Sequence, residues 1–448
     1  MKNYRPVSNL AFASKVVEKV VASQLNAHMV EHSLMEPMQS AYRQYHSTEL
    51  ALLRVHNDIM QAIDRRKCVL LVLLDLSAAF DTIDHDILLQ RLQVSVGVCG
   101  TALDWFRSYL SHRTQSVRIQ STTSRPQTLY FGVPQGSVLG PVVFTVYSAP
   151  IADIARRHGL NVHLYADDTQ LYLMFDVDDA DDAIARVEAC VRDIRQWMAI
   201  NKLKLNDGKT VVLLLRSPSQ GGVPDITELT IGESNITYSD TARNLGAVFD
   251  KHLNMEAHIG SMCRTAFFHL QNIASIRNVL DTDSAKMIVQ ALVTSRIDYC
   301  NSLLFGVPQS VLGRLQAVQN AAARVVTRTG WLDHITPALY ELHWLPVEYR
   351  INFKILLNTY KALNGLAPQY IRELLVPYAP SRTLRSSQQQ LLTVPRCRLR
   401  TYGNRSFAWA APTLWNTLPQ TIRLASTLES FKTSLKTHLF RQAFDQFM

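Results

Sequence analysis

In the N-terminal part of the chain, the hydrophobic positions first recur at helical spacing and then form one continuous run. They recur at helical spacing over 9–35 and again over 47–65. The next segment, at 67–76, is KCVLLVLLDL, a continuous run of Val and Leu that is typical of a strand buried on both faces. The pattern predicts two helices that lead into a central strand.

The rest of the first half alternates between strand and helix patterns, and the second half is mostly helical. We expect a helix from about 138, a hairpin at 161–175, a helix at 179–199 and a strand at 209–216. Helical spacing then recurs at 256–279, 283–304, 310–328 and 348–364, with a last amphipathic helix near the C-terminus. The expected fold is α+β over 1–250, helical over 251–365, with a further basic region over 366–448.

Composition indicates an ordered globular chain. Of the 448 residues, 47% are hydrophobic and 19% are charged. No apolar run approaches the ~20 residues of a membrane span, and MKNYRPVSNLAFASK lacks a signal-peptide pattern, so we expect an intracellular protein with no membrane partner. The cysteines form no Cys-x-x-Cys pair, which excludes a zinc knuckle. We expect all six to be buried thiols: Cys68, Cys99, Cys190, Cys263, Cys300 and Cys397.

Positive charge is concentrated in the second half. Residues 251–448 contain 22 Lys and Arg against 10 Asp and Glu, a net charge of +12, whereas residues 1–250 contain 24 against 27, a net charge of −3. A basic half beside an acidic one favours a polyanionic partner. The alternative is that the basic residues only solubilise a helical region.

Three carboxylates lie where predicted strands end. Asp75 ends the central strand, and Asp167 and Asp168 occupy the bend of the hairpin, within HLYADDTQLY. Because neighbouring side chains of a strand face opposite ways, only one of the adjacent pair shares a face with Asp75. We expect Asp167 to be the direct metal ligand, and Asp168 to bind less directly or to hold the turn.

Carboxylates that converge at apolar strand ends repel one another unless cations neutralise them. Hard oxygen ligands favour Mg²⁺, and a pair of such ions is the arrangement that polymerases use for in-line phosphoryl displacement. The alternative is an exposed Asp-Asp turn beside an unrelated strand end. Motifs elsewhere in the chain favour the metal site.

Seven motifs follow one another along the chain. They are NYRPVSNL…SKVVEKVVASQL (3–25), QSAYRQYHSTELAL (39–52), LLDLSAAFDTIDH (73–85), GVPQGSVLGPVVF (132–144), YADD (165–168), WMAINKLKLNDGKT (197–210) and ARNLGAVFD (242–250). This ordered set resembles the reverse transcriptase of non-LTR (LINE-type) retrotransposons, in particular the chicken-repeat and jockey-like group. The resemblance covers nearly the whole chain. It implies a right-hand polymerase, with fingers and palm over 1–250, then a helical thumb and a basic C-terminal region.

The resemblance also implies roles for single residues. Asp75, Asp167 and Asp168 would hold two Mg²⁺ ions, for which Mn²⁺ can substitute. The carbonyl of Leu76 would be an extra ligand at the nucleotide site. Phe80 matches the aromatic residue that excludes a 2′-hydroxyl, and its alternative is a core aromatic at the start of a helix.

Further residues match positions around the nucleotide. Gln135 would lie against the templating pair or the incoming nucleotide, in a loop where Gly136 allows close backbone approach. Arg43 would meet the triphosphate, and its alternative is a surface ion pair. Lys209 matches the lysine proposed to protonate leaving pyrophosphate, and its alternative is a strand-edge lysine.

Three other segments carry expectations. Leu245 and Gly246 match the primer-grip turn, where glycine would let the primer backbone approach. The basic and aromatic segment PRCRLRTYGNRSFAWAAPTLW (395–415) would either contact RNA or form a strand pair with aromatics inward and arginines outward. We assign a structural role in a first helical turn to three acidic residues: Asp81, Asp84 and Asp86.

We therefore expect an RNA-directed DNA polymerase that extends a DNA 3′-hydroxyl on an RNA template. Its partners would be template RNA, primer or target DNA, and deoxynucleoside triphosphates, with a nuclear site of action. Because the chain begins almost at the finger motif and has no room for an upstream endonuclease, we expect a fragment or a 5′-truncated copy. The alternative function is a catalytically inactive remnant that at most binds nucleic acid.

Overall fold

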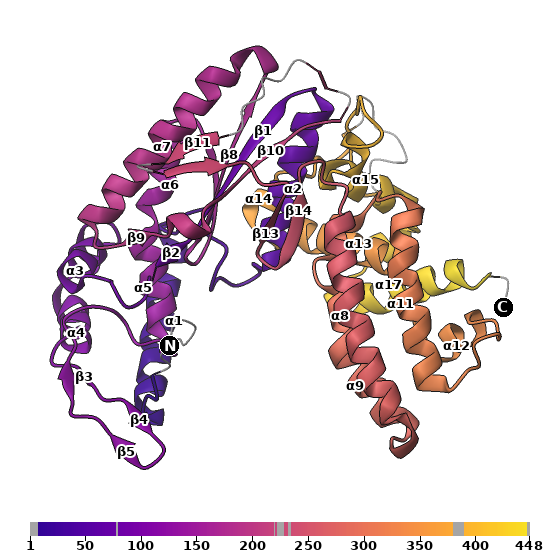
Figure 1. The fold of residues 1–448 in the computed structure, drawn as a ribbon, viewed down its shortest axis with the longest axis horizontal. Coiled ribbons are helices and arrows are strands. Elements are labelled where there is room, and N and C mark those ends of the chain that lie inside the picture. The colour runs from indigo at the N-terminus through magenta and orange to yellow at the C-terminus, as the bar shows by residue number, and fades with distance from the viewer. Residues whose placement is uncertain are drawn as a thin grey trace.

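The chain forms two limbs that diverge from a central sheet like an inverted V (Figure 1). The computed structural model describes residues 8–77, 79–218, 220–221, 228–231, 234–379 and 389–445. One limb holds most helices of the first half, and the other holds the helices of the second half. The sheet and helix α2 (Thr48–Asp64) lie where the two limbs meet.

The first half mixes helices and strands, which confirms the α+β expectation. Its other helices are α1 (Phe12–Glu31), α3 (His85–Val94), α4 (Gly100–Leu110), α5 (Leu139–Ser148), α6 (Pro150–Arg157) and α7 (Ala180–Ile200). Its longer strands are β1 (Cys68–Leu74), β7 (Asn161–Tyr165), β8 (Asp168–Phe175) and β10 (Val211–Leu215). The shorter strands are β2 (Leu76–Ser77), β3 (Thr114–Gln115), β4 (Arg118–Ile119), β5 (Thr122–Thr123), β6 (Gln127–Thr128), β9 (Lys204–Leu205), β11 (Glu228–Ile231), β12 (Ser234–Thr237), β13 (Thr241–Asn244) and β14 (Ala247–Asp250).

The central sheet has the strand order β10–β1–β8–β7, and each neighbouring pair is antiparallel. Alternate side chains of its inner strand β1 enter two different hydrophobic cores. Leu70 and Val72 pack into the core that contains α3 to α7, and Val69 and Leu71 pack into the core that contains α2 and the later helices. Burial on both faces explains why this strand is apolar at every position.

The second half is helical, as expected. Its helices are α8 (Glu256–Ser275), α9 (Thr282–Val289), α10 (Ser295–Asp298), α11 (Gln309–Thr327), α12 (Thr336–Glu341), α13 (Val347–Leu363), α14 (Gln369–Arg372), α15 (Phe407–Thr417), α16 (Gln420–Arg423) and α17 (Leu428–Ala443). The single helix expected over 283–304 is interrupted by a π-helical turn at Gln290–Thr294 and ends at Asp298.

The last part of the chain packs back onto the first half. Helix α15 contacts both α13 and α2. The Asp64 carboxylate at the end of α2 accepts hydrogen bonds from the backbone N–H of Arg398 (2.9 Å) and of Leu399 (2.6 Å). Residues after 365 therefore share one hydrophobic core with the preceding helices and with α2.

The expected strand pair at 395–415 is wrong. The segment instead forms a 3₁₀ turn at Gly403–Arg405 and helix α15. The aromatic and small side chains of Phe407, Ala411 and Trp415 are buried at helical spacing, which the alternation argument missed. Arg405 is also buried rather than outward, and burial lowers its pKa to about 10.

The cysteines are mostly buried, as expected, with two departures. Cys99 is exposed before α4 and Cys397 is half-buried, and all six are free thiols. Among the described residues, no helix is both long enough and apolar enough to cross a bilayer.

Candidate active site

The C-terminal end of β1 places Asp75 beside a lysine and an asparagine. Lys209 Nζ donates to Asp75 Oδ2 at 3.1 Å, and Asn206 Nδ2 donates to the same oxygen at 3.2 Å. The backbone N–H of Asn206 also donates to the Asp75 carbonyl at 2.9 Å. The Asp75 side chain is 24% exposed, so this carboxylate is partly desolvated and its charge is offset by the ammonium. Lys209 lies in a 3₁₀ turn at Asp207–Lys209 rather than on the strand expected at 209–216.

The next residue, Leu76, begins β2 and pairs with Leu205 of β9. Its side chain is buried. The backbone around Asp75 is therefore held by strand pairing on both sides in sequence: β1 pairs before it, and β2 pairs after it.

Asp167 and Asp168 lie at the hairpin between β7 and β8, as expected. Tyr165 pairs with Asp168, so Ala166 and Asp167 form a two-residue turn. Ala166 has a φ of 56°, in the left-handed region that a residue with a Cβ rarely adopts. Burial and the nearby Asp167 carboxylate both raise the pKa of Tyr42, which places that phenol close to the turn.

The strand register brings Asp75 and Asp168 to neighbouring strand ends. Leu74 of β1 pairs with Thr169 of β8, so the residues that follow and precede them stand at the same edge. Asp167 lies in the turn, where the alternation argument that favoured it over Asp168 does not apply. The preference between these two ligands therefore stays a prediction.

The donor set suits a divalent cation. Carboxylate oxygens at neighbouring strand ends are ligands that Mg²⁺ prefers, and the Lys209 ammonium already supplies positive charge to Asp75. In the part of the chain that the structure describes, no three Asp, Glu, His or Cys side chains are grouped closely enough to hold a metal ion. The residues present therefore fit a divalent cation in the type of their ligand atoms, with the carboxylates of Asp75 and Asp168 at neighbouring strand ends.

Phe80 lies half-buried beside the glycine-rich loop. Its ring stacks on Phe144 of α5, with centroids 4.8 Å apart. The carbonyl of Phe80 accepts from Val133 N–H at 2.9 Å, and Gly132 N–H donates to the Ile83 carbonyl at 2.7 Å. A Cβ on Gly132 would lie 2.8 Å from the Asp81 carbonyl oxygen, so this position requires glycine.

Gln135 bonds a residue that the sequence assigned to a helix. Its Nε2 donates to both carboxylate oxygens of Asp81, at 3.0 and 3.1 Å. Helix α3 begins only at His85, with Asp84 as its N-cap and Asp86 in its first turn. The structural assignment is confirmed for Asp84 and Asp86, and Asp81 instead lies before the helix. Gly136 follows with a φ of 100° and is exposed.

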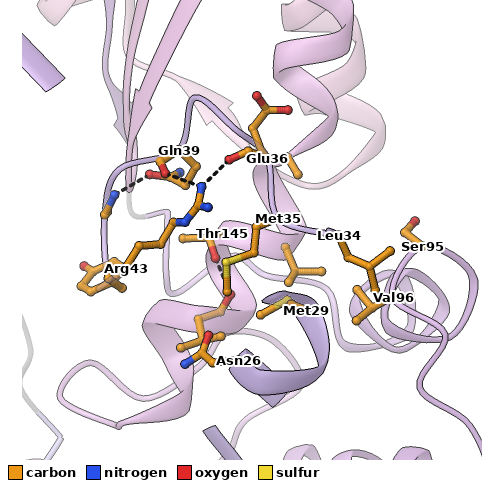
Figure 2. Close-up of a pocket in the computed structure, with 15 residues that line it drawn as sticks. Asn26, Met29, Leu34, Met35, Glu36, Gln39, Arg43, Ser95, Val96 and Thr145 are labelled. Atoms are coloured by element: carbon orange, nitrogen blue, oxygen red, sulfur yellow. Dashed lines mark hydrogen bonds between the residues drawn. The ribbon is translucent and has the colours of Figure 1, made fainter. Parts of the chain in front are cut away.

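Arg43 points inward, toward backbone carbonyls rather than into an ion pair. One guanidinium nitrogen donates to the carbonyls of Glu36 (2.7 Å) and Gln39 (3.0 Å), as Figure 2 shows. Burial lowers the pKa of this side chain. The surface-ion-pair alternative is wrong for this structure, and the arginine closes the loop that precedes α2.

Leu245 and Gly246 form a second two-residue hairpin turn, between β13 and β14. Their φ values are 43° and 87°. Tyr299 Oη donates to the Leu245 carbonyl at 2.6 Å, and a Cβ on Gly246 would lie 3.0 Å from the Tyr299 ring. Asn244 Nδ2 donates to Gln170 Oε1 of β8 at 2.7 Å, which fixes this hairpin to the central sheet. In this structure the group that approaches Gly246 closely is the Tyr299 ring.

A family model described as reverse transcriptase (RNA-dependent DNA polymerase) matches residues 1–249. The chain belongs to the reverse transcriptase family. Its resemblance to transposon-encoded members is confirmed by relatives among characterised proteins. A probable RNA-directed DNA polymerase from transposon BS of Drosophila melanogaster is 27% identical over 361 residues, which are 78% of this chain and 39% of that protein. The RNA-directed DNA polymerase from mobile element jockey of Drosophila funebris is 23% identical over 338 residues, 73% and 36% respectively.

The chain spans less than half the length of these relatives. Among solved structures, telomerase from Candida tropicalis in complex with a TWJ fragment of telomeric RNA aligns with a TM-score of 0.38 and 10% identity, over 75% of this chain and 54% of that one. Apo telomerase from the same organism aligns equally well.

Three residues that sequence reasoning missed position the site of this reverse transcriptase: Gln39, Asn206 and Tyr299. Gln39 Oε1 accepts from Ala166 N–H at 3.1 Å and from Ala41 N–H at 2.9 Å, and the side chain is 2% exposed. Asn206 holds Asp75, and Tyr299 holds the second turn. Gln39 and Asn206 lie inside motifs that the sequence displays, whereas nothing near Tyr299 marks it.

Proposed function

We propose that this reverse transcriptase is an RNA-directed DNA polymerase that adds deoxynucleotides to a DNA 3′-hydroxyl on an RNA template. The observation that supports the proposal most is the placement of Asp75 and Asp168 at neighbouring ends of antiparallel strands, beside the Lys209 ammonium. A partly desolvated carboxylate (Asp75), an exposed one (Asp168) and the Lys209 ammonium at one edge suit phosphoryl transfer, in which charge must be neutralised on entering and leaving oxygens.

In this proposal the sheet with its two hairpins is the palm, the loops and helices before it are the fingers, and α8 onward is the thumb. Asp75, Asp167 and Asp168 would hold Mg²⁺, or Mn²⁺, which when bound lowers the pKa of the primer hydroxyl. Phe80 would lie at the sugar edge, where its ring is supported by Phe144.

Lys209 has a defined task in the same proposal. Its ammonium neutralises Asp75 in the free protein, and its 62% exposed side chain is free to turn toward the departing pyrophosphate. Gln135, held by Asp81, presents its loop to the nucleotide. The partners would be template RNA, primer or target DNA and deoxynucleoside triphosphates, and the site of action the nucleus.

Primer extension on an RNA template tests the proposal. With Mg²⁺ and dNTPs, Asp75→Asn should lower the extension rate by about 10³-fold or more, because one metal-binding charge is removed from the transition state. Asp86→Asn is the matched control, since Asp86 lies in the first turn of α3 away from the strand ends, and should stay within about twofold of wild type.

The competing proposal is a catalytically inactive remnant that binds nucleic acid. The absence of a preformed three-ligand cluster among the described residues favours it. If wild type extends no faster than Asp75→Asn, the polymerase proposal fails and the remnant is correct.

A further inference from the structure

Helices α13 and α17 pack against each other and present basic side chains on adjoining faces. Tyr360 of α13 stacks on Phe431 of α17, with ring centroids 4.2 Å apart. Their C-terminal neighbours, Lys361 and Lys432, are therefore brought together where the two helices cross. Lys354 of α13 lies seven residues before Lys361, about two helical turns away on the same face.

An open pocket lies at one end of this contact. It has a volume of about 500 Å³, and Lys286, Arg350, Lys354 and Lys436 contribute to its lining, together with the partly exposed Trp344. We call the six cations of the pocket and the helix crossing the basic furrow: Lys286, Arg350, Lys354, Lys361, Lys432 and Lys436.

Acidic side chains balance only part of this charge. Arg350 pairs with Asp298, Lys354 with Glu49 at 3.3 Å, and Lys432 with Glu429 at 2.7 Å. Within the described ranges, Lys286, Lys361 and Lys436 form no ion pair. Burial lowers the pKa of Lys361, and the nearby cations Lys354 and Lys432 lower it further, while the Glu49 carboxylate offsets part of this effect. Unbalanced cations held at close range favour an anionic partner.

The furrow is continuous with the second hairpin turn of the candidate site. The Tyr299 hydroxyl donates its proton to the Leu245 carbonyl and lies 3.3 Å from the hydroxyl of Thr48, the first residue of α2. The neighbouring Glu49 pairs with Lys354. Two neighbouring residues at the start of α2 therefore link the turn to the furrow: Thr48 contacts Tyr299, and Glu49 pairs with Lys354.

We propose that the basic furrow binds the phosphodiester backbone of a single-stranded nucleic acid outside the strand-end site. RNA and DNA strands share this chemistry, and the partly exposed indole of Trp344 lines the same pocket beside the lysines, where an aromatic ring suits an unpaired base. The position of the furrow beside the second turn favours nucleic acid over an acidic protein, and in this respect the inference rests on the proposed function.

The test measures binding by the full chain without Mg²⁺ or dNTPs. Fluorescence anisotropy with a labelled single-stranded RNA is compared for wild type and for the triple variant Lys286→Gln, Lys361→Gln, Lys436→Gln. Affinity should fall about tenfold or more, and the slope of log affinity against log salt should decrease by about 2, because three phosphate contacts are lost. An equally long DNA should lose affinity to a similar degree.

The matched control removes the same charge from three exposed arginines of the same half that lie outside the furrow and outside segment 395–415: Arg314→Gln, Arg372→Gln, Arg441→Gln. Its affinity should stay within about twofold of wild type. Equal losses in both triples, or none in the furrow triple, would overturn the proposal. Displacement of RNA by poly-glutamate at equal charge concentration would also overturn it and indicate an acidic protein partner.

Folding is controlled separately. Neutralising Lys361 relieves repulsion, so the midpoint of thermal unfolding of the furrow triple should not fall below that of wild type. The single variant Lys436→Glu, at an exposed position, should also weaken RNA binding, by at least about threefold. The binding assay contains no polymerisation, so it tests the furrow independently of the polymerase proposal. If the polymerase proposal fails but the furrow proposal holds, wild type and Asp75→Asn should still bind RNA equally well.

Discussion

The two hairpin turns of the candidate site differ in how each is held. The turn of Ala166 and Asp167 and the turn of Leu245 and Gly246 each have two residues, and each holds a residue with a Cβ at positive φ. The first is fixed by Gln39, which is 2% exposed, and the second by Tyr299, which is 39% exposed. Water can replace the second contact but has no access to the first.

Positive φ at Ala166 and Leu245 is a local strain that only surrounding contacts maintain. Gln39 belongs to a loop that itself bridges to β7, because Ser40 N–H donates to the Leu164 carbonyl and Leu164 N–H to the Met38 carbonyl, both at 2.9 Å. The turn of Ala166 and Asp167 is therefore held by a buried support. The turn of Leu245 and Gly246 has a more exposed support.

Removing the buried support should have the largest effect. Gln39→Leu leaves the N–H groups of Ala166 and Ala41 without an acceptor, so the free energy of unfolding should fall by about 3 kcal/mol. Primer extension should fall about 10²-fold because the turn carrying Asp167 shifts. Urea unfolding and steady-state extension measure the two effects. The exposed Gln44→Leu, in the same loop, should change neither, and equal behaviour of the two variants would refute the role of Gln39.

A reciprocal exchange of glycine and alanine tests the strain in both turns. Gly246→Ala introduces a Cβ at a φ of 87° and 3.0 Å from Tyr299, and should lower the free energy of unfolding by about 2 kcal/mol. Ala166→Gly removes a strained Cβ and should change it by less than about 1 kcal/mol. Urea unfolding at one pH compares them. A larger loss in Ala166→Gly than in Gly246→Ala would contradict this account.

Acid should weaken both hairpins by a similar, smaller amount. His163 of β7 shares a 2.8 Å hydrogen bond with Ser40, and His258 Nδ1 accepts from Val248 N–H of β14 at 3.3 Å. Burial lowers the pKa of His163 to about 3 and that of His258 to about 4. The unfolded chain, with a histidine pKa of about 6.5, then binds more protons than the folded one at mildly acidic pH, so stability falls as pH drops below that value.

Each of these histidines should remove about 1 kcal/mol between pH 7 and pH 5.5. Denaturant unfolding at the two pH values measures the loss in wild type, His163→Gln and His258→Gln. Each variant should lose about 1 kcal/mol less than wild type over this interval. A pH dependence that is unchanged in both variants would show that neither imidazole is held neutral.

The sequence predicted correctly those features that depend only on a residue's own segment. The apolar run of β1 predicted an inner strand, and YADD predicted the bend of a hairpin, both of which the structure shows. The sequence favoured Asp167 as the partner of Asp75, and the register instead brings Asp168 to the edge where β1 ends. The supports of the site could not be predicted in the same way. Gln39 and Ala166 are 127 positions apart, and their contact depends on how α2 and the sheet pack.

Polar residues gave the least reliable expectations. Arg43 was expected at the triphosphate or in a surface ion pair, and it donates to backbone carbonyls of its own loop. Arg405 was expected to face outward, and it is buried. Lys209 lies in a 3₁₀ turn and bonds Asp75 across the end of the sheet, while its role at pyrophosphate stays a prediction. Charge alone does not specify which partner a flexible side chain reaches.

The return of α15 onto α2 links the order of synthesis to folding. Helix α2 leaves the ribosome early, but the backbone groups that bond its Asp64 and the side chains that cover its apolar face arrive only with residues 398–415. A nascent chain that stops after the segment matched by the family model therefore exposes the buried flank of its own central helix. The segment matched by the family model therefore completes the packing of α2 only after residues 398–415 have been synthesised.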